Sequence, residues 1–573
     1  MKSSINKIFT GFLGAGLMLT TSCVGDLDLE PNDPNIVPGN ALTEADYQNV
    51  LAKCYGGLAY SGQTGPNGDC DISGLDGGTS QYTRALFMMN EFTTDEAIWI
   101  HADVGVIDLV TNTFGKDNGN IFGTYSRLYS HIAVCNDFIR QAKTNENVNV
   151  QRMVLEARAL RALSYYWVVD IFGMGSFTLD TDELFSSPEQ KDRTFLFKWL
   201  DGELTDIEGT YKAKYPNYKP TYGSIGLDAV QALHARLLLN AQVYTKGAVN
   251  GYARCADICK EIIDRHQDGP LGNGLAETYN YLFCADNDKY MPGGSGVNEI
   301  LWGVVYDKDF TRAYGGTQFL MAAAYTNNAV KDDAGICNSA DYGINNPWKC
   351  MHATEQFSNV FANDDASDAR WAMWLKEPNG YNKANTGFGK FCDGYVVAKF
   401  NNLYSDPAGR QWTDPDGQSW GPGWSAKNGG KYADGVVAAR QETWVDTDLP
   451  LFRLAEVYLT YAECNIVAGV GDAALALQYV NNVRKRAGVY EWTANEMRTA
   501  NILDERQREL HWELTRRSDL VRHGKYSGGD YMWSYKGSQS DMAGQAFPAY
   551  MDVMPIPQQI INAQTDFKQN PGY

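Results

Sequence analysis

The chain has 573 residues, a formal charge of −20 and 44% hydrophobic residues. A nucleic-acid-binding protein needs clustered lysine and arginine to displace counterions, so this acidic balance argues against a nucleic-acid partner. The hydrophobic fraction is ordinary for a globular protein, but 12% of the residues are aromatic, which is more than helix packing requires. We therefore expect part of the aromatic surplus to lie at the surface.

Residues 1–22 predict an export signal that ends just before Cys23. Lys2 and Lys7 precede an apolar run from Ile8 to Leu19, which is too short to span a bilayer as a stable helix. The segment LTTSC resembles a lipoprotein cleavage box, in which the cysteine becomes the acylated N-terminus. Several acyl chains at Cys23 would hold the mature protein stably on a membrane. The alternative is a plain secretory signal with an incidental cysteine.

Apolar residues at helical spacing predict a mainly α-helical scaffold. Leu155, Ala159, Ala162 and Tyr166 lie along one side of a nearly apolar helix, so this helix is buried and its alanines let a partner backbone approach closely. The same spacing predicts helices at about 124–143, 152–172, 195–213, 224–246 and 252–266. We expect Ser224 to cap the fourth of them, and we expect the set to stack as pairs in a curved slab.

The helical pattern fades between about 270 and 445. Residues 297–307 predict a strand from their β-branched and aromatic content. The tract 376–436 is rich in Gly, Asn and Asp and carries Trp412, Trp420 and Trp424, which favours a functional loop. Helices are predicted again at 448–469, 472–489 and 501–524, and the last 20 residues, 554–573, are predicted to be extended.

Motifs for catalysis are not evident in the sequence. The cysteines show no CxxC pair, so no metal cage is predicted, and Cys255 and Cys259 are interpreted as buried free thiols. Glu509 and Glu513 are four residues apart and are the best candidates for a glycosidase pair. The flanking Arg506, Arg508, Arg516 and Arg517 instead favour a salt-bridged helix face with both carboxylates ionised. An enzyme is therefore the weaker hypothesis, and we predict no catalytic residue.

Two short acidic pairs suggest a cation site. Asp286 and Asp288 form one pair, and Asp446 and Asp448 form the other. Calcium takes several oxygen ligands, so the pairs could jointly hold such an ion if the fold unites them. The alternative is that they are turn and helix-cap carboxylates. No cofactor is predicted to be required.

The loop aromatics suit carbohydrate binding. A sugar ring packs its C–H face on a flat tryptophan or tyrosine ring, and its hydroxyls need a few polar side chains around the edge. Such a site requires no catalytic group. The alternative, that the rings pack in the core, is favoured for most of the 14 tryptophans.

Five motifs along the chain resemble the SusD/RagB family of surface lipoproteins from Bacteroidetes. They are EARALRALSYYWVVDIFG at 156–173, LPLFRLAEVYLTYAE at 449–463, NNVRKRAGV at 481–489, DERQRELHWELTRRSDLVRHG at 504–524, and PIPQQI with the closing QNPGY. The resemblance implies one domain over 23–573, with an N-terminal part at about 24–246 and a C-terminal part at about 270–573. It also implies tetratricopeptide-like helix pairs that carry long loops, a few short strands and a non-catalytic glycan-binding face. The expected partner is a SusC-like TonB-dependent transporter, and the expected location is the surface of the outer membrane.

The resemblance is closest to the starch-binding member of the family, which implies an aromatic arc for an α-glucan. Its positions fall on Trp99, Tyr314 and Trp348, and its arginine falls on Arg84. An expected asparagine falls on Val104, so His101 or Asp103 is predicted to take over its hydrogen bonds. A calcium site implied by the same resemblance falls on Asp288, Asp446 and Asp448. The alternatives are another polysaccharide such as a fructan, a glycoside hydrolase, or a purely structural partner of the transporter.

Overall fold

The structure is a computed structural model that describes residues 42–184, 186–325, 329–330, 336–337, 339–371, 374–376, 395–405, 412–413, 419–420, 437–438 and 443–573. The predicted signal and lipidation site at Cys23, as well as Trp424, lie outside the described residues. Within the described ranges, none of the helices combines the length and the apolar character needed to cross a membrane.

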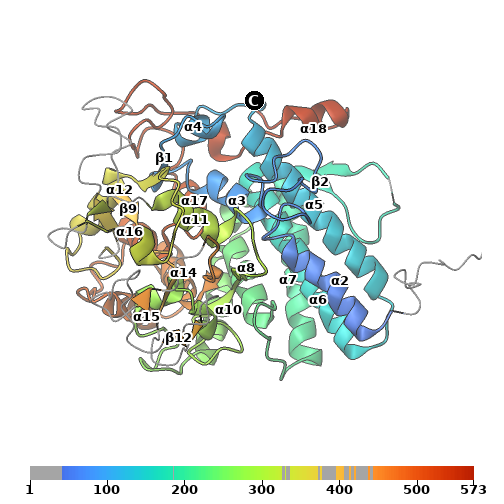
Figure 1. The fold of residues 1–573 in the computed structure, drawn as a ribbon, viewed down its shortest axis with the longest axis horizontal. Coiled ribbons are helices and arrows are strands. Elements are labelled where there is room, and N and C mark those ends of the chain that lie inside the picture. Colours follow the sequence, from blue (N-terminus) through green and yellow to red (C-terminus); the bar gives the residue numbers. More distant parts are fainter. Residues whose placement is uncertain are drawn as a thin grey trace, which may run out of the picture.

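The N-terminal half is a set of helices packed side by side (Figure 1). Its helices are α2 (Glu44–Gly56), α3 (Tyr82–Asn90), α4 (Val106–Val110), α5 (Gly119–Ala142), α6 (Val148–Trp167), a π-turn η2 (Val168–Phe172), α7 (Arg193–Lys214), α8 (Leu227–Leu239), α9 (Ala241–Tyr244) and α10 (Tyr252–Arg265). Successive members pack on one another, α5 on α6, α6 on α7, α7 on α8 and α8 on α10. The predicted scaffold of stacked helix pairs is confirmed.

The buried face of α6 follows the predicted seam. Leu155, Ala159, Ala162 and Tyr166 are each at most 4% exposed. The side chain of Asn147 accepts hydrogen bonds from the amides of Asn149 and Val150 and so caps the start of α6. Small residues at the contact let α5 and α7 approach α6 closely, which keeps the slab compact.

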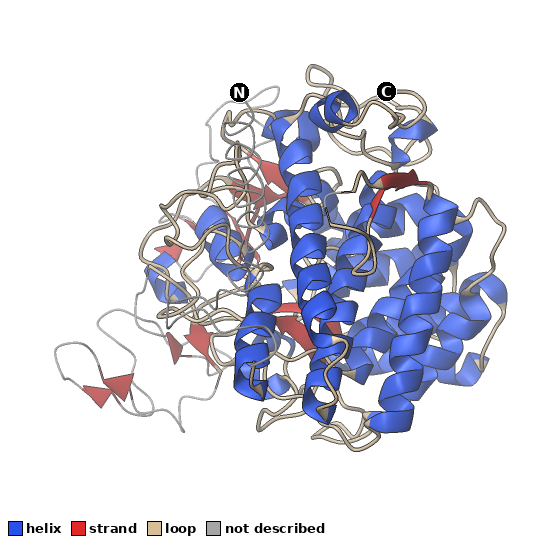
Figure 2. Ribbon diagram, turned by 90° about the vertical axis from the view of Figure 1, so that its right-hand side faces the viewer, coloured by secondary structure: helices blue, strands red, loops and turns tan. Residues whose placement is uncertain are grey.

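The C-terminal half adds helices to the slab and also contains shorter helices and strands outside it. Its helices are η3 (Tyr279–Phe283), η4 (Asn287–Tyr290), α11 (Gly316–Ala324), η6 (Ser339–Tyr342), α12 (Glu355–Ala362), α14 (Leu454–Ala468), α15 (Ala473–Arg486), α16 (Thr499–Leu510), α17 (Arg516–Arg522), η8 (Ala549–Asp552) and α18 (Gln558–Ala563). Helix α14 packs between α10 and α15, so the slab runs on across the two halves. In Figure 2 most of the long loops lie on the left, and helices of the slab fill the right.

The described strands are short and pair antiparallel. A six-stranded sheet has the order β1 (Ala97–Trp99), β7 (Met351–Ala353), β9 (Tyr395–Val397), β8 (Trp374–Lys376), β5 (Ala329–Val330) and β6 (Ile336–Cys337). Four two-stranded pairs are β2 (Gly175–Phe177) with β3 (Glu189–Lys191), β4 (Ile300–Val304) with β14 (Leu449–Arg453), β10 (Leu403–Tyr404) with β13 (Val437–Ala438), and β11 (Trp412–Thr413) with β12 (Ser419–Trp420).

Several local predictions are wrong. The fourth helix begins at Leu227 after Gly226 and is not capped by Ser224, whose hydroxyl pairs with that of Thr221 at 3.0 Å. Residues 449–453, predicted as helix, form β14 because they pair with β4. The C-terminal segment predicted to be extended contains the short helix α18.

The predicted helix at 501–524 is two helices. Residues 511–515 separate α16 from α17, and Trp512 and Leu514 there adopt φ angles of +62° and +65°. Neither residue is a glycine or a proline, so the sequence carries no local signal for the break. The reversal turns α17 back toward the core, where it contacts α3.

Candidate glycan-binding site

The side chains predicted to form the site line one hollow of about 570 Å³, called here the first hollow. It contains Arg84, Trp99, His101, Asp103, Tyr314 and Trp348. These residues come from α3, from β1 and the loop after it, and from the loops before α11 and before β7. Segments more than 200 residues apart therefore meet here, because Arg84 and Tyr314 are separated by 230 positions.

Sheet pairing and two glycines bring these segments together. Trp99 lies opposite Met351 in the β1–β7 pair, which places Trp348 near it. Gly316 has a φ of +51°, and a Cβ there would lie 2.2 Å from the Tyr306 ring. Only glycine fits such a position, so the glycines after Tyr314 allow its loop to pack tightly at the start of α11.

The rings of the first hollow differ in exposure. Trp99 is only 5% exposed, and it stacks on Phe319 with ring centroids 6.0 Å apart. Tyr314 and Trp348 are half-buried and meet edge to face at 5.7 Å. The three predicted rings thus gather around one hollow, but Trp99 forms its wall and is not an open platform.

Trp444 is an aromatic residue of this region that was not among the predicted site residues. It is half-buried, and its ring centroid lies 5.1 Å from that of Tyr314. Tyr314 therefore contacts the rings of both Trp348 and Trp444. The only available signal was a tryptophan two residues before the acidic pair that begins at Asp446.

Arg84 is buried in the wall without a carboxylate partner among the described residues. Its guanidinium carbon lies 4.6 Å from the centroid of the Phe319 ring, and its Nη1 donates to the carbonyl oxygens of Gly78 at 3.0 Å and Tyr314 at 3.4 Å. Its Nε has no hydrogen-bond partner in the described part of the chain. Burial lowers the pKa of Arg84 to about 10, so the group stays charged at neutral pH. An unsatisfied buried donor of this kind favours an added acceptor such as a sugar hydroxyl.

Comparisons with known proteins decide the family. The sequence profile of the SusD family matches residues 273–573. The chain is 30% identical to the starch-binding protein SusD of Bacteroides thetaiotaomicron, over 99% of both chains. The chain belongs to the SusD family. A second relative, the SusD-like protein P25 of Formosa agariphila, is 42% identical over 13% of this chain and 15% of its own.

Solved structures share the SusD fold with this chain. A SusD superfamily protein from Parabacteroides distasonis superposes with a TM-score of 0.65 at 18% identity, over 93% of this chain and all of that one. The surface glycan-binding protein A of Bacteroides thetaiotaomicron, solved in complex with laminarihexaose, gives a TM-score of 0.61 at 18% identity, over 92% of this chain and all of that one. The prediction of a SusD-like, mainly α-helical fold is confirmed.

Val104 marks the point where the expected asparagine of the SusD resemblance is missing. It is 96% exposed at the rim of the first hollow. Of the two predicted substitutes, Asp103 already accepts a hydrogen bond from the indole nitrogen of Trp99, and the ring of His101 lies 6.4 Å from that of Trp99. Exposed Asn346 also lines this hollow and offers an amide that the sequence analysis did not consider.

The four acidic residues predicted to hold calcium are partly engaged with the protein. Asp448 accepts hydrogen bonds from the Tyr222 hydroxyl at 2.7 Å and the Tyr306 amide at 2.8 Å. Burial, with a smaller contribution from Asp288 and Asp446, raises the pKa of Asp448 to about 8. Asp286 instead accepts from the Ser405 amide at 2.8 Å.

The metal chemistry of these carboxylates can be judged from their arrangement. Carboxylate oxygens are hard donors and suit calcium. A bound cation would also reduce the electrostatic repulsion between neighbouring ionised carboxylates. However, no three acidic, histidine or cysteine side chains in the described ranges are grouped so that they could hold a metal ion. Calcium at Asp288, Asp446 and Asp448 stays a prediction.

Glu509 and Glu513 lie in a buried group of charges, called here the ion cluster. It consists of Glu299, Glu509, Glu513, Arg370, Arg453, Arg486 and Lys399. Arg453 donates to Glu509 at 2.9 Å and to Glu513 at 2.6 Å. Burial opposes ionisation, but these neighbouring cations lower the pKa of both glutamates below their usual range.

The ion cluster corrects the predicted partners of the two glutamates. They are ionised as predicted, but they are buried and do not form an exposed helix face. Arg506 pairs with Asp519, Arg508 with Glu505 and Arg516 with Asp95, while Arg517 donates to the Asp552 carbonyl. A general acid needs a raised pKa, so the lowered pKa of Glu509 and Glu513 disfavours that role.

The remaining cysteine and tryptophan predictions can also be compared with the structure. Cys255 and Cys259 are buried free thiols, as predicted. Trp167, Trp302 and Trp512 are fully buried, in agreement with core packing for most tryptophans. Trp412 and Trp420 lie opposite each other in the β11–β12 pair, and the rest of the 376–436 tract falls mostly outside the described residues.

Proposed function

We propose that this chain is a non-catalytic glycan-binding protein whose first hollow holds an α-glucan such as starch or a malto-oligosaccharide. The observation that carries the proposal is the grouping of Tyr314 and Trp348 beside Arg84, which has a buried donor without a partner. The rings supply faces for the C–H surface of a sugar, and the guanidinium supplies a donor for its hydroxyls. The 30% identity to a protein named for starch binding supports an α-glucan.

Binding at such a site should be weak. Ring stacking contributes on the order of 1 kcal/mol per ring, so a single site is expected to bind in the micromolar to millimolar range. Weak binding suits a protein that must release its ligand to a transporter.

Calorimetric titration with maltoheptaose tests the proposal. Trp348→Ala is the variant of choice, because the ring is half-buried and Trp99 is too deeply packed for a clean truncation. We expect weaker binding by about tenfold or more. Trp371, which is half-buried against Phe361 at 6.2 Å and does not line the first hollow, provides the control Trp371→Ala. Equal heats for the wild type and Trp348→Ala would reject the site.

The glycan is tested against alternatives in the same assay. Laminarihexaose, the ligand named for a structural neighbour, and a fructan oligosaccharide are titrated in parallel. If either one binds more tightly than maltoheptaose, the proposed α-glucan is wrong, while the proposed location of the site is unaffected. A glycoside hydrolase would instead release reducing ends from starch, and this release would be lost in Glu509→Gln.

The cellular role follows from the family and from Cys23. We place the protein at the outer-membrane surface, acylated at Cys23, where it passes the glycan to a SusC-like TonB-dependent transporter. Replacing Cys23 by serine should release the protein from the membrane fraction, and an affinity tag on the wild type should recover a large β-barrel. A protein that binds no glycan alone but recovers the barrel would be a structural partner of the transporter.

Calcium at Asp288, Asp446 and Asp448 is a separate part of the proposal. Because burial and like charge raise the pKa of Asp448, a bound cation should stabilise the fold. Calcium is then expected to raise the melting temperature of the wild type by mass action, and not that of Asp448→Asn. Equal melting curves with calcium and with a chelator would reject the proposed calcium site.

A further inference from the structure

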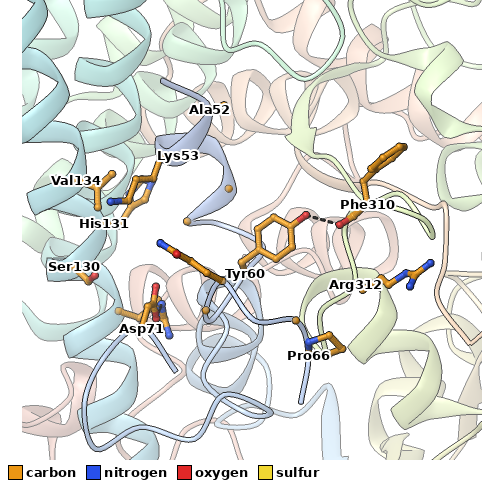
Figure 3. A pocket seen from close by; sticks show the side chains of 16 residues that line it. Ala52, Lys53, Tyr60, Pro66, Asp71, Ser130, His131, Val134, Phe310 and Arg312 are labelled. Atoms are coloured by element: carbon orange, nitrogen blue, oxygen red, sulfur yellow. Dashed lines mark hydrogen bonds and ion pairs between the residues drawn. The ribbon is translucent and has the colours of Figure 1, made fainter. Parts of the chain in front are cut away.

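A second hollow of about 880 Å³ lies beside the first and is the larger of the two (Figure 3). The end of α2 and the middle of α5 form one part of its wall, and the glycine-rich loop at 62–71 and the segment around Phe310 form the other. In Figure 3, Tyr60 stands in the centre, between Val134 and His131 of α5 and the backbone of Phe310. Nothing in the sequence analysis pointed to this hollow.

The second hollow has the same combination of rings and cations as a carbohydrate site. Tyr60 donates its hydroxyl to the Phe310 carbonyl at 2.6 Å and so holds the Phe310 loop against the end of α2. The Phe310 side chain is 80% exposed, which is unusual for so large an apolar group. Lys53 and Arg312 are exposed at the wall. Arg312 pairs with the exposed Asp309 at 3.9 Å, and Lys53 forms no ion pair with any described residue.

The floor of the second hollow is fixed by a buried ion pair. Arg127 is 3% exposed in its side chain and donates to Asp71 at 2.7 Å, while the Asp71 side chain keeps 42% of its surface exposed. Arg127 also donates to the Cys70 sulfur at 3.2 Å, so the glycine-rich loop is held at two residues. The hollow is therefore a preformed feature with an accessible carboxylate, two exposed cations and two rings.

The two hollows are separated by the segment from Arg312 to Tyr314, called here the wall. Pro66 and Arg312 line the second hollow, and Tyr314 lines the first. The Tyr314 hydroxyl donates to the Asn67 side chain at 3.1 Å, and this bond is exposed to solvent. Arg312 and Tyr314 are two residues apart, so their backbones are separated by at most about 7 Å. A linear oligosaccharide that reached from the first hollow into the second would therefore cross the wall at Tyr314.

We propose that the second hollow is an extension subsite that binds the continuing sugar units of a neutral oligosaccharide whose other end lies in the first hollow. Tyr60 and Phe310 provide ring surfaces, and Lys53, Arg312 and Asp71 bond to hydroxyls. This inference rests on the proposed glycan binding and adds that the protein selects long chains over short ones. Such selection matches a protein that must capture polymer fragments before uptake.

A comparison of maltotriose with maltoheptaose tests the extension subsite. The wild type should bind maltoheptaose about tenfold more tightly than maltotriose, because only the longer ligand reaches over the wall. Phe310→Ala removes an exposed side chain, so folding should be preserved. It is expected to bring the affinity for maltoheptaose down toward that for maltotriose while leaving maltotriose binding unchanged. Lys53→Gln, on the exposed side of α2, should act in the same direction by a smaller factor.

Leu271→Ala provides a matched control, because Leu271 is 45% exposed and lies outside both hollows. Tight maltoheptaose binding that survives both Phe310→Ala and Lys53→Gln would overturn the extension subsite and leave the first hollow intact. Equal wild-type affinities for the two oligosaccharides would overturn it as well. Failure of the wild type to bind either oligosaccharide would overturn the proposed α-glucan function and this inference with it.

Discussion

Arg84 and Arg453 are both buried arginines, and they differ in what surrounds them. Arg453, in the ion cluster, is 1% exposed and donates to three glutamates, Glu299, Glu509 and Glu513. Arg84, in the first hollow, is 9% exposed, and its hydrogen bonds go to two carbonyl oxygens while its Nε stays without a partner. Arg486 of the ion cluster also has an Nε without a partner, so the difference between the two regions lies in the carboxylates that surround the guanidinium group.

The pKa directions support the same distinction. The carboxylates around Arg453 raise its pKa well above the ordinary value, although burial acts against them. Burial lowers the pKa of Arg84 to about 10, because Asp76 and Asp103 compensate only in part for the loss of water. The same type of residue is therefore ion-paired with carboxylates in one region and has no ion pair with a described residue in the other.

The largest expected effect is on stability in the ion cluster. Glu509→Gln removes a negative charge that pairs with Arg370, Arg453 and Arg486. Three buried guanidinium groups then lose one of their ion-pair partners. Breaking a buried ion pair from one side costs about 3–5 kcal/mol. We expect a large drop in the melting temperature, whereas Glu491→Gln, in an exposed pair with Lys485, should change it little. If the melting temperature of Glu509→Gln falls no more than that of Glu491→Gln, the ion cluster does not have the structural role that distinguishes it from Arg84.

Acid should destabilise the ion cluster next. Although burial opposes ionisation, the neighbouring cations lower the pKa values of Glu509 and Glu513 in the folded state. The contribution of these two carboxylates to stability is therefore complete above the unfolded pKa of about 4.3. That contribution is lost as the pH falls below this value toward the folded pKa values. Thermal unfolding between neutral and acidic pH should show a smaller loss in Glu509→Gln than in the wild type. The loss in an Arg84 variant should equal that of the wild type, since Arg84 does not titrate there.

Arg84→Gln should affect binding more than stability. A hydrogen bond to a charged group contributes about 1.5–3 kcal/mol, which corresponds to a loss of roughly tenfold to a hundredfold in affinity for maltoheptaose. Because Arg84 has no ion-pair partner among the described residues, the melting temperature should change far less than in Glu509→Gln. Calorimetry and thermal unfolding on the same samples separate the two effects. Unchanged affinity with lost stability would place Arg84 in the structural group.

The smallest effect is expected at the rim of the first hollow. Val104→Asn restores the amide that the family resemblance predicts there, at a side chain that is 96% exposed. One additional hydrogen bond contributes about 0.5–1.5 kcal/mol, so affinity for an α-glucan should rise up to about tenfold. Val148→Asn, at a side chain that is 61% exposed at the start of α6, is the control. A weaker α-glucan complex would indicate that this protein prefers a different sugar at this position.

Prediction of the elements succeeded where local patterns are strong. Long helices such as α6 and α10 have an apolar face that repeats every three to four residues, so their presence and approximate ends follow from spacing alone. The helix predicted through Leu451 failed because a short apolar run is compatible with strand or helix, and its pairing with β4 decided between them. The break at Trp512 was missed because it depends on backbone packing and not on a glycine or a proline.

The sequence by itself determined the stacked helices and the family resemblance, because periodicity and motifs are local. The resemblance in turn indicated four side chains of the candidate site, Arg84, Trp99, Tyr314 and Trp348. Only the tertiary structure decided that Trp99 is a wall, that Trp444 flanks Tyr314 and that Arg453 and not Arg506 faces Glu509. It also decided that a second hollow adjoins the first. These features join segments that are far apart in the chain, and such contacts depend on how the helices and loops pack together.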